Sequence, residues 1–525
     1  MTKDILFNNS NTLYALHYEA VFDETTYVIP KQIAFNSKTG VVSPILSPPI
    51  LPPAGATTRP ATSGPIDSRS ESPYKQPSFP PPPKAPHVYD VQLFDDFMTE
   101  NPKVRFVYVH WVDYLVTTRV RIVPIKEFKR MIHEGDRIGI SQGKSGALQD
   151  DNPTSGINTA EQIYIEPDLL SLRRTHSKDP LPSATVLSYF RSASGSPLSS
   201  CPRNNLEILL NDLQYNQSTT LLVGFEIQVT FLSRNSNSQG DSYSPLRKTH
   251  GRTIATPEQW LQLPFLTESM LALDEMGIEM QQVSAETGQG QYEFILPPQP
   301  PVAAIDTLIQ ARQAISHIAT LHGLRATMYP KPFDSVTATN AHISLHPPVR
   351  DMHFFVGGVV AHLPAISAFS MAESVSYAPV VDETGMWVAW GTQNRDVPLR
   401  RLKEGTWELR CLDGMANMYL AVTAMVATGL LGLQSAGAET MHYSQLDVPV
   451  DPNRMDAAGR ARFGVVQRMP STLEEALLAL MKDSALVEAL GHGAVRDYVG
   501  MKEIEQRMLA EMGEAERRTY LIERY

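Results

Sequence analysis

Three separated segments of this chain alternate polar and apolar residues with a period of two, which predicts β-strands with one polar face. The polar positions are Glu226 and Gln228 in the first segment, Asn340, His342 and Ser344 in the second, and Glu408 and Arg410 in the third. A half-buried strand commonly turns such a face to water. Carboxylate, imidazole and guanidinium groups recur here, however, and this repetition favours one concave sheet with a functional face.

A fourth segment predicts a hairpin with a carboxylate on each side of its turn. It begins at Glu286, ends at Glu293 and reads Glu-Thr-Gly-Gln-Gly-Gln-Tyr-Glu. Two β-type runs around a glycine-containing turn are typical of a hairpin. Taken alone, this stretch favours a solvent-exposed turn whose two glutamates have no functional role. Beside the three polar strand faces it becomes a candidate site for Mg²⁺, which prefers carboxylate oxygens.

Basic residues near these strands are candidates for binding phosphate. Arg395 and Arg400 lie in the run Asn-Arg-Asp-Val-Pro-Leu-Arg, shortly before Glu408. Arginine matches phosphate geometry and can neutralise charge that develops during phosphoryl transfer. An isolated arginine pair is ordinarily a solvated surface feature. Lys331 adds a further cation close to the segment that contains Asn340.

Composition excludes several classes of function. The 525 residues carry a formal net charge of -11, which argues against a nucleic-acid partner bound through a broad basic surface. Two cysteines, without metal-type spacing, fit a reducing compartment and exclude a disulfide scaffold. The sequence shows no uncharged apolar run of transmembrane length and no signal pattern at Met1. We therefore expect a cytoplasmic protein without a membrane partner.

The chain divides into four predicted parts. Residues 1–42 form a poorly defined N-terminal extension, in which Thr26-Tyr-Val-Ile is a candidate strand. Residues 43–88 form a Pro-rich linker that cannot bury enough apolar surface to offset its ordering entropy. Residues 89–200 form an α+β module with its connection, including helices at 91–100 and 125–134. Residues 201–525 form the larger domain, with one helix predicted at 353–372 and a helical C-terminus at 472–524.

The ordered motifs from residue 88 to the end resemble the glutamine synthetase family, most closely its fungal glutamine-synthetase-like branch, which includes the FluG-type proteins. Gly224-Phe-Glu-Ile-Gln resembles the G-x-E-x-E strand, and the segment 286–293 resembles E-x-x-x-x-Q-x-E. Further matching segments, in family order, are Ala326-Thr-Met-Tyr-Pro-Lys-Pro, Asn340-Ala-His-Ile-Ser-Leu, the arginine segment from Trp390, Trp407-Glu-Leu-Arg and Asn417-Met-Tyr-Leu.

This resemblance implies an α+β fold with a β-grasp-like N-terminal module and a catalytic domain built on a curved antiparallel sheet. It also implies a ring-shaped homo-oligomer and a place in nitrogen metabolism, glutamine biosynthesis included. The implied reaction is an ATP-dependent ligation with Mg or Mn, in which a small-molecule acid is phosphorylated and then joined to ammonia or an amine. By motif position the metal ligands would be Glu226, Glu286, Glu293, Glu408, Gln228 and Asn340. The catalytic arginines would be Arg395, Arg400 and Arg410, and the substrate or nucleotide contacts would be His342, Ser344, Lys331, Arg395 and Arg400.

Three departures from the family pattern leave two functional interpretations open. Gln228 replaces the second glutamate of E-x-E, Asn340 replaces the first histidine of H-x-H, and Pro379 replaces the arginine of S-Y-x-R. Gln228 and Asn340 keep a carbonyl oxygen that can bind Mg²⁺, although Gln228 removes a negative charge. The first interpretation is an ATP-dependent carboxylate–amine ligase. The second is a non-catalytic scaffold or regulatory protein that kept the fold and lost part of the site.

Overall fold

The computed structural model of the chain divides into two compact units, Met1–Pro80 and Pro81–Tyr525. The structure describes residues 89–146, 160–235, 242–246, 257, 261, 263–286, 288–330, 332–333, 352–377, 387–435, 442–443 and 445–525, and only the backbone of strands at 5–9, 12–16, 32–36, 41–44 and 339–346. Outside these residues lie the candidate strand at 26–29, Lys331, Pro379 and the predicted linker except for the last residues of strand β4. The four predicted domain boundaries stay predictions.

The first unit contains a four-stranded antiparallel sheet in chain order. Its strands are β1 (Ile5–Asn9), β2 (Thr12–Leu16), β3 (Gln32–Asn36) and β4 (Val41–Pro44). This sheet was not among the elements predicted for the extension. Short runs of this kind specify a strand partner weakly, because no strongly alternating apolar face fixes their register.

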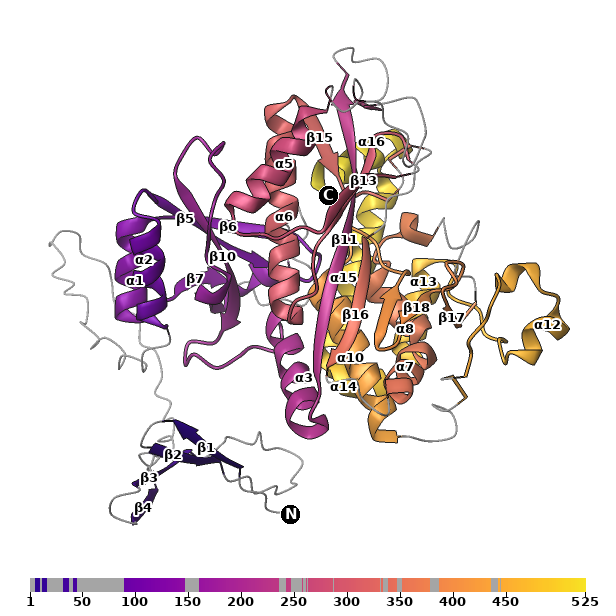
Figure 1. Ribbon diagram of the computed structural model, residues 1–525, viewed down its shortest axis with the longest axis horizontal. Helices are drawn as coiled ribbons and strands as arrows, with labels where there is room; N and C mark the ends of the chain where they lie inside the picture. Colours follow the sequence, from indigo (N-terminus) through magenta and orange to yellow (C-terminus); the bar gives the residue numbers. More distant parts are fainter. Residues whose placement is uncertain are drawn as a thin grey trace, which may run out of the picture. The chain divides into compact units, whose positions relative to one another are not determined.

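The second unit begins with a small module of two helices beside a mixed sheet (Figure 1). Helices α1 (Val91–Glu100) and α2 (Ile125–Glu134) confirm the two predicted helices. The sheet order is β6 (Thr118–Pro124), β5 (Phe106–Val112), β10 (Ser183–Arg191), β8 (Gln162–Pro167) and β7 (Ile138–Ser141), with β9 (Arg173–Arg174) paired to β10. Strand β10 runs parallel to β5, and the other pairings are antiparallel.

The larger domain is organised around strand β11 (Thr220–Arg234), which is 15 residues long and lies near the centre of Figure 1. The sheet order is β13 (Gln282–Ala285), β14 (Gln291–Ile295), β11, β16 (Thr339–His346), β19 (Thr406–Leu409), β18 (Leu399–Lys403) and β17 (Trp390–Thr392). Strands β12 (Tyr243–Pro245) and β15 (Leu324–Thr327) also pair with β11. Strands β17 and β18 run parallel, and the other pairings of this sheet are antiparallel. The predicted fold class, α+β with a mainly antiparallel sheet, is confirmed.

One face of the large sheet is covered by apolar helices. Phe225, Ile227 and Val229 alternate with the polar residues of β11, are at most 1% exposed, and belong to the main hydrophobic core. The helices that contribute to this core include α3 (Pro202–Gln217), α5 (Pro264–Glu275), α6 (Pro301–Leu321), α7 (Met352–Ala361), α8 (Leu363–Ser370) and α10 (Met418–Ser435). Burial on this face leaves the opposite face of β11 for polar side chains.

The single helix predicted at 353–372 is wrong, because the structure has two helices here. Helices α7 and α8 are bent by 73° at the break around His362. Pro364 stands in the first turn of α8, where its missing N–H is tolerated, although it could not continue the hydrogen bonds of α7.

Helix α10 is apolar because it lies in the core. Among the helices in the described residues, α10 is the one that is by itself long and apolar enough to cross a membrane. Helices α7 and α8 reach that length and hydropathy only when the bent pair is counted as a single span. The most apolar window of α10 is 78% buried inside the protein. Gly358 of α7 and Gly432 of α10 bring these two helices into close backbone contact.

The predicted helical C-terminus is confirmed as a series of separate helices. These are α13 (Leu473–Lys482), α14 (Ser484–Leu490), α15 (His492–Glu511) and α16 (Glu514–Arg524). Thr472 caps α13 by accepting from the backbone N–H of Glu475, and Gly491, with φ of 88°, separates α14 from α15. A short helix, α12 (Ala457–Arg462), precedes them.

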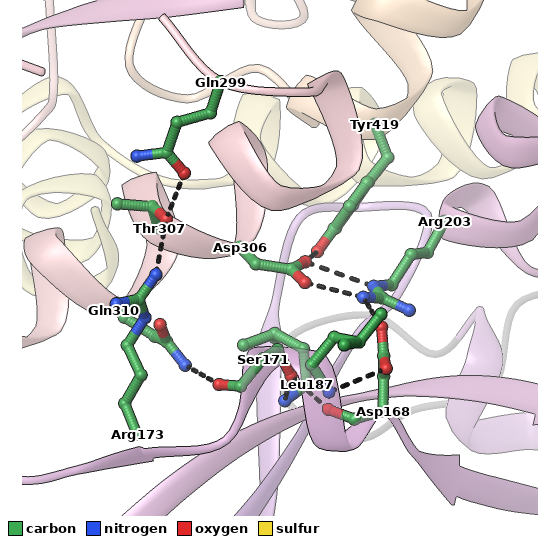
Figure 2. A network of polar contacts seen from close by, with 11 residues as sticks. Asp168, Ser171, Arg173, Leu187, Arg203, Gln299, Asp306, Thr307, Gln310 and Tyr419 are labelled. Carbon is green, nitrogen blue, oxygen red and sulfur yellow. Dashed lines mark hydrogen bonds and ion pairs between the residues drawn. The ribbon is translucent and has the colours of Figure 1, made fainter. Parts of the chain in front are cut away.

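A buried polar network joins the small module to the larger domain (Figure 2). Arg203 at the start of α3 donates to Asp306 of α6 through Nε at 3.1 Å and Nη2 at 2.6 Å, and to Asp168 of the module at 2.5 Å. The Tyr419 hydroxyl of α10 donates to the same Asp306 carboxylate. The Arg203 and Asp306 side chains are 4% and 5% exposed, so each ionic group depends on its partners for solvation.

A second chain of contacts strengthens this junction. Arg173 of β9 donates to the Gly277 carbonyl at 2.8 Å and to the Thr307 hydroxyl at 3.3 Å, and Thr307 donates to Gln299 at 3.0 Å. Gln310 donates to the Ser171 carbonyl at 2.8 Å. Helix α6 therefore holds the module through hydrogen bonds along its first half.

We expect Asp306→Ala to destabilise the protein by ~3–5 kcal/mol, because it removes the main counterion of a buried guanidinium. Tyr419→Phe is the matched control, since it removes one hydrogen bond to the same carboxylate and should cost ~1 kcal/mol. Urea unfolding followed by circular dichroism measures both. Equal losses for the two variants would contradict this account of the junction.

Candidate functional site

The register of the large sheet places the predicted acidic positions on one face. Glu226 of β11 is paired with Asn340 of β16, and Gln228 is paired with Glu293 of β14. Directly paired residues of antiparallel strands point to the same side of the sheet. The structure therefore brings Glu226, Gln228 and Glu293 together on the face opposite the helix-covered core, and we call this group, with Glu286, the acid end.

The same face continues across the sheet to the arginines. His342 of β16 is paired with Glu408 of β19, and Glu408 is paired with Arg400 of β18. For Asn340, His342 and Ser344 the structure describes only the backbone, so their register positions are known and their predicted contacts stay predictions. We call Glu408, Arg400 and Arg410 the arginine end.

At the acid end, carboxylates lie close enough to affect one another. Burial, followed by the negative charge of Glu226 and then that of Glu286, raises the pKa of Glu293 to about 7, while a hydrogen bond from Gln228 opposes the rise. The Glu293 residue is 8% exposed. Crowded carboxylates of this kind are stabilised by a shared cation.

The acid end fits a divalent cation in charge and in ligand type, although its geometry is open. Within the described part of the chain, no three His, Cys, Asp or Glu side chains lie close enough together to hold a metal ion. Glu226 and Glu286 are near enough to Glu293 to act on its charge. To bind Mg²⁺, their carboxylate oxygens would have to move closer together. Mg²⁺ usually keeps several of its bound waters when carboxylates coordinate it.

A chain of amides ends on Glu293 and fixes the orientation of Gln228. The backbone N–H of Gly288 donates to Gln291 Oε1 at 2.9 Å, and Gln291 Nε2 donates to Gln228 Oε1 at 3.2 Å. Gln228 Nε2 then donates to Glu293 Oε1 at 3.2 Å. The Gly288 backbone N–H can only donate, so it sets the direction of the whole amide relay.

The amide relay bears on the predicted role of Gln228. Its carbonyl oxygen, the atom expected to bind a cation, accepts from Gln291, while its nitrogen faces Glu293. A cation bound between Gln228 and Glu293 through this oxygen would therefore require the amide to turn around. Sequence analysis did not assign a role to Gln291, although it lies two residues before Glu293 and so on the same face.

At the arginine end, Glu408 holds two guanidinium groups. Its side chain is 3% exposed, Oε1 accepts from Arg410 Nη1 at 2.6 Å, and Oε2 accepts from Arg400 Nη1 at 3.0 Å. Arg400 Nη2 also donates to Gln393 Oε1 at 2.9 Å. Each carboxylate oxygen retains a further lone pair, so Glu408 can orient the arginines and still contact a cation.

Arg395 is not brought into this group. It lies exposed in the turn between β17 and β18, and this turn is held by Asn394, whose side chain donates to the Val448 carbonyl at 3.0 Å. A role for Arg395 stays a prediction.

Comparisons with known proteins agree with this geometry. The family described as "Glutamine synthetase, catalytic domain" matches residues 199–520. "Protein fluG" of Emericella nidulans is 39% identical over 447 residues, which is 83% of this chain and 51% of that protein, so the chain spans about half the length of this relative. "Gamma-glutamylpolyamine synthetase GlnA3" of Streptomyces coelicolor is 27% identical over 57% of this chain and 67% of its own length.

Solved structures support the fold. A structure described as "GmaS/ADP complex-Conformation 1" has a TM-score of 0.67 and 21% sequence identity, covering 81% of this chain and 98% of the other. Another, described as "Crystal structure of novel glutamine synthase homolog", has a TM-score of 0.65 and 23% identity, covering 80% and 99%.

We expect Glu293→Gln to become more stable relative to the wild type as pH rises from 5 to 8 in metal-free buffer. A carboxyl whose folded pKa is about 7 binds its proton more tightly than in the unfolded chain, so its contribution is lost as pH rises through 7. The amide cannot ionise, and its advantage at pH 8 should be on the order of 1 kcal/mol after allowing for solvent screening.

Thermal melts across pH measure this difference, with Glu279→Gln as the control because Glu279 is exposed shortly before the same hairpin. A gap between Glu293→Gln and wild type that does not change with pH would contradict the crowding of carboxylates at the acid end.

Proposed function

Because the chain belongs to the glutamine synthetase family, we propose that it is an ATP- and Mg²⁺-dependent ligase that joins a carboxylic acid to an amine or ammonia. This proposal rests on the strand register, which places the predicted residues on one face of the large sheet. Carboxylates lie at one end of this face, and at the other end a buried glutamate accepts hydrogen bonds from two arginines. Such a face suits a cation-bound triphosphate with its transferred group directed toward the guanidiniums.

The acid end would hold the cation. Glu226, Glu286 and Glu293 supply hard oxygen ligands, and their crowding is relieved when a cation is shared among them. A divalent cation held by these carboxylates would neutralise negative charge on the phosphate groups. Mn²⁺ fits the same donor set.

The arginine end would stabilise charge during phosphoryl transfer. A substrate carboxylate oxygen attacks the γ-phosphorus of ATP, the bond to ADP breaks, and an acyl phosphate forms. The amine nitrogen then attacks the acyl carbon, phosphate leaves, and the amine loses a proton. Arg400 and Arg410, fixed by Glu408, are placed to bind the transferring phosphoryl oxygens.

We propose that the nitrogen substrate is an organic amine in preference to ammonia. The Streptomyces relative is named for gamma-glutamylpolyamine synthesis, and it is 27% identical over the matched region. This chain covers only 51% of the Emericella protein, so activities of that whole protein do not transfer to it. We further propose a cytoplasmic ring of identical subunits, as the family resemblance implies.

A second candidate function is a scaffold or regulator without turnover. The orientation of Gln228 favours it, because an N–H group points at Glu293 where a catalytic site would gain from a cation ligand. The two candidates differ in one measurement, which is release of ADP that depends on Mg²⁺, an acid and an amine together. A panel of dicarboxylic amino acids with ammonia, monoamines and polyamines tests it, and ADP release from no pairing would favour the scaffold.

We expect Glu286→Ala to weaken Mg²⁺–ATP binding ~10-fold or more, because it removes one of the oxygen ligands of the acid end. Isothermal titration calorimetry measures the affinity. Glu279→Ala removes an exposed carboxylate seven residues earlier and should leave the affinity unchanged. Equal affinities for wild type and Glu286→Ala would remove the acid end from the nucleotide site.

We expect Arg400→Gln to lower the rate of ADP formation ~100-fold while changing the affinity for Mg²⁺–ATP much less, because its charge acts chiefly as the phosphoryl group transfers. Arg401→Gln is the matched control. Arg401 is paired with Trp407, its guanidinium lies over Trp390 at 5.7 Å, and the alternation of the strand turns it from Arg400's face. An equal rate loss in both variants would show a general effect on β18.

A further inference from the structure

The amide relay at the acid end places a hydrogen-bond donor where a cation would bridge two carboxylates. Gln228 and Glu293 are directly paired across β11 and β14, so a cation between their side chains would touch both residues. The Gln228 amide nitrogen instead stands 3.2 Å from Glu293 Oε1. A cation needs bare oxygen lone pairs, and the N–H end of an amide dipole repels it.

The relay makes this orientation costly to reverse. If the Gln228 amide turned its oxygen toward Glu293, its nitrogen would face the nitrogen of Gln291, and that contact pairs two donors. Turning Gln291 as well would set its nitrogen against the Gly288 backbone N–H, which can only donate. Each of these residues is at least partly buried, so replacing a donor–acceptor contact by two facing donors is penalised.

We propose that Gln228, held with its nitrogen toward Glu293 by Gln291 and the Gly288 amide, takes the place of one divalent cation at the acid end. The cation that the proposed function requires then binds on the Glu226 and Glu286 side of Glu293, and none binds between residues 228 and 293. The residue at position 228 therefore sets how many cations the site holds. This inference rests on the proposed function, because it presumes a cation at the acid end.

The neighbouring residues are consistent with a single cation on that side. Ser284 of β13 contacts the other carboxylate oxygen of Glu293, Oε2, at 3.5 Å, a long hydrogen bond that a cation can replace at little cost. Glu226 and Glu286 act on the charge of Glu293, so their carboxylates lie near it. Gln228 and Ser284 thus contact different oxygens of the Glu293 carboxylate.

The test is the binding of Mn²⁺ alone to the full-length chain, followed by electron paramagnetic resonance of free Mn²⁺ and by calorimetry. Gln228→Glu should bind one more ion than wild type, or bind Mn²⁺ at least ~10-fold more tightly. Gln228→Met removes the N–H group and keeps a similar shape, and it should bind Mn²⁺ as tightly as wild type or more tightly. Gln281→Glu, which adds the same charge at an exposed position before β13, should match wild type.

The two Gln228 variants distinguish a Gln228 that excludes a cation from one that binds it, because the two cases predict opposite changes in Mn²⁺ affinity. If Gln228 were a ligand through its oxygen, Gln228→Met would bind Mn²⁺ ~10-fold more weakly, and this result would overturn the inference. An unchanged number and affinity of ions in Gln228→Glu would overturn it too, while Mn²⁺ binding to wild type would leave the proposed function standing.

Two further outcomes concern the proposed function separately. Mn²⁺ binding by Gln228→Glu without any by wild type would support the role of Gln228 and defeat the cation-dependent ligase proposed for the natural chain. Failure of every variant to bind Mn²⁺ would overturn both. Gln291→Met gives a check that adds no charge, because it frees the Gln228 amide to turn and should raise Mn²⁺ affinity above that of wild type.

Discussion

The register of strand β11 is the constraint on which the rest of the catalytic domain depends. Its apolar residues, Phe225, Ile227 and Val229, are almost fully buried against helices, and this burial prevents the strand from slipping. A shift by one residue would drive Glu226 and Gln228 into the core and turn three large apolar side chains outward. Because β11 pairs with β14 on one side and β16 on the other, its register also sets where Glu293 and Glu408 stand.

The two ends of this polar face differ in how the negative charge of their carboxylates is compensated. At the arginine end a buried carboxylate is compensated by two guanidiniums, so Glu408 serves as a rigid holder for positive charge. At the acid end, negative groups gather around Glu293, which accepts a hydrogen bond from the Gln228 amide. The face is therefore polarised along the sheet, which is the arrangement that a cation and a triphosphate would complete.

Much of the fold could be predicted from the sequence, because its strongest signals are local. Helices α1 and α2 match their predicted limits, since caps and apolar spacing mark them. The bend between α7 and α8 was missed because Pro364 reads equally as a tolerated first-turn residue or as a break. The sheet of the first unit was missed because short runs do not identify their partners. The network around Asp306 joins it to Arg203 and Tyr419, each more than one hundred residues away, so no local pattern reveals it.

The sequence by itself determined which residues share the functional face, because strand alternation and helix burial depend on the spacing of apolar side chains. Only the tertiary structure decided what those residues do to one another. The direction of the Gln228 amide follows from Gln291, Glu293 and the Gly288 backbone, and the engagement of Glu408 follows from guanidiniums on two strands. Hydrogen-bond direction depends on every partner in three dimensions, whereas periodicity needs only the chain.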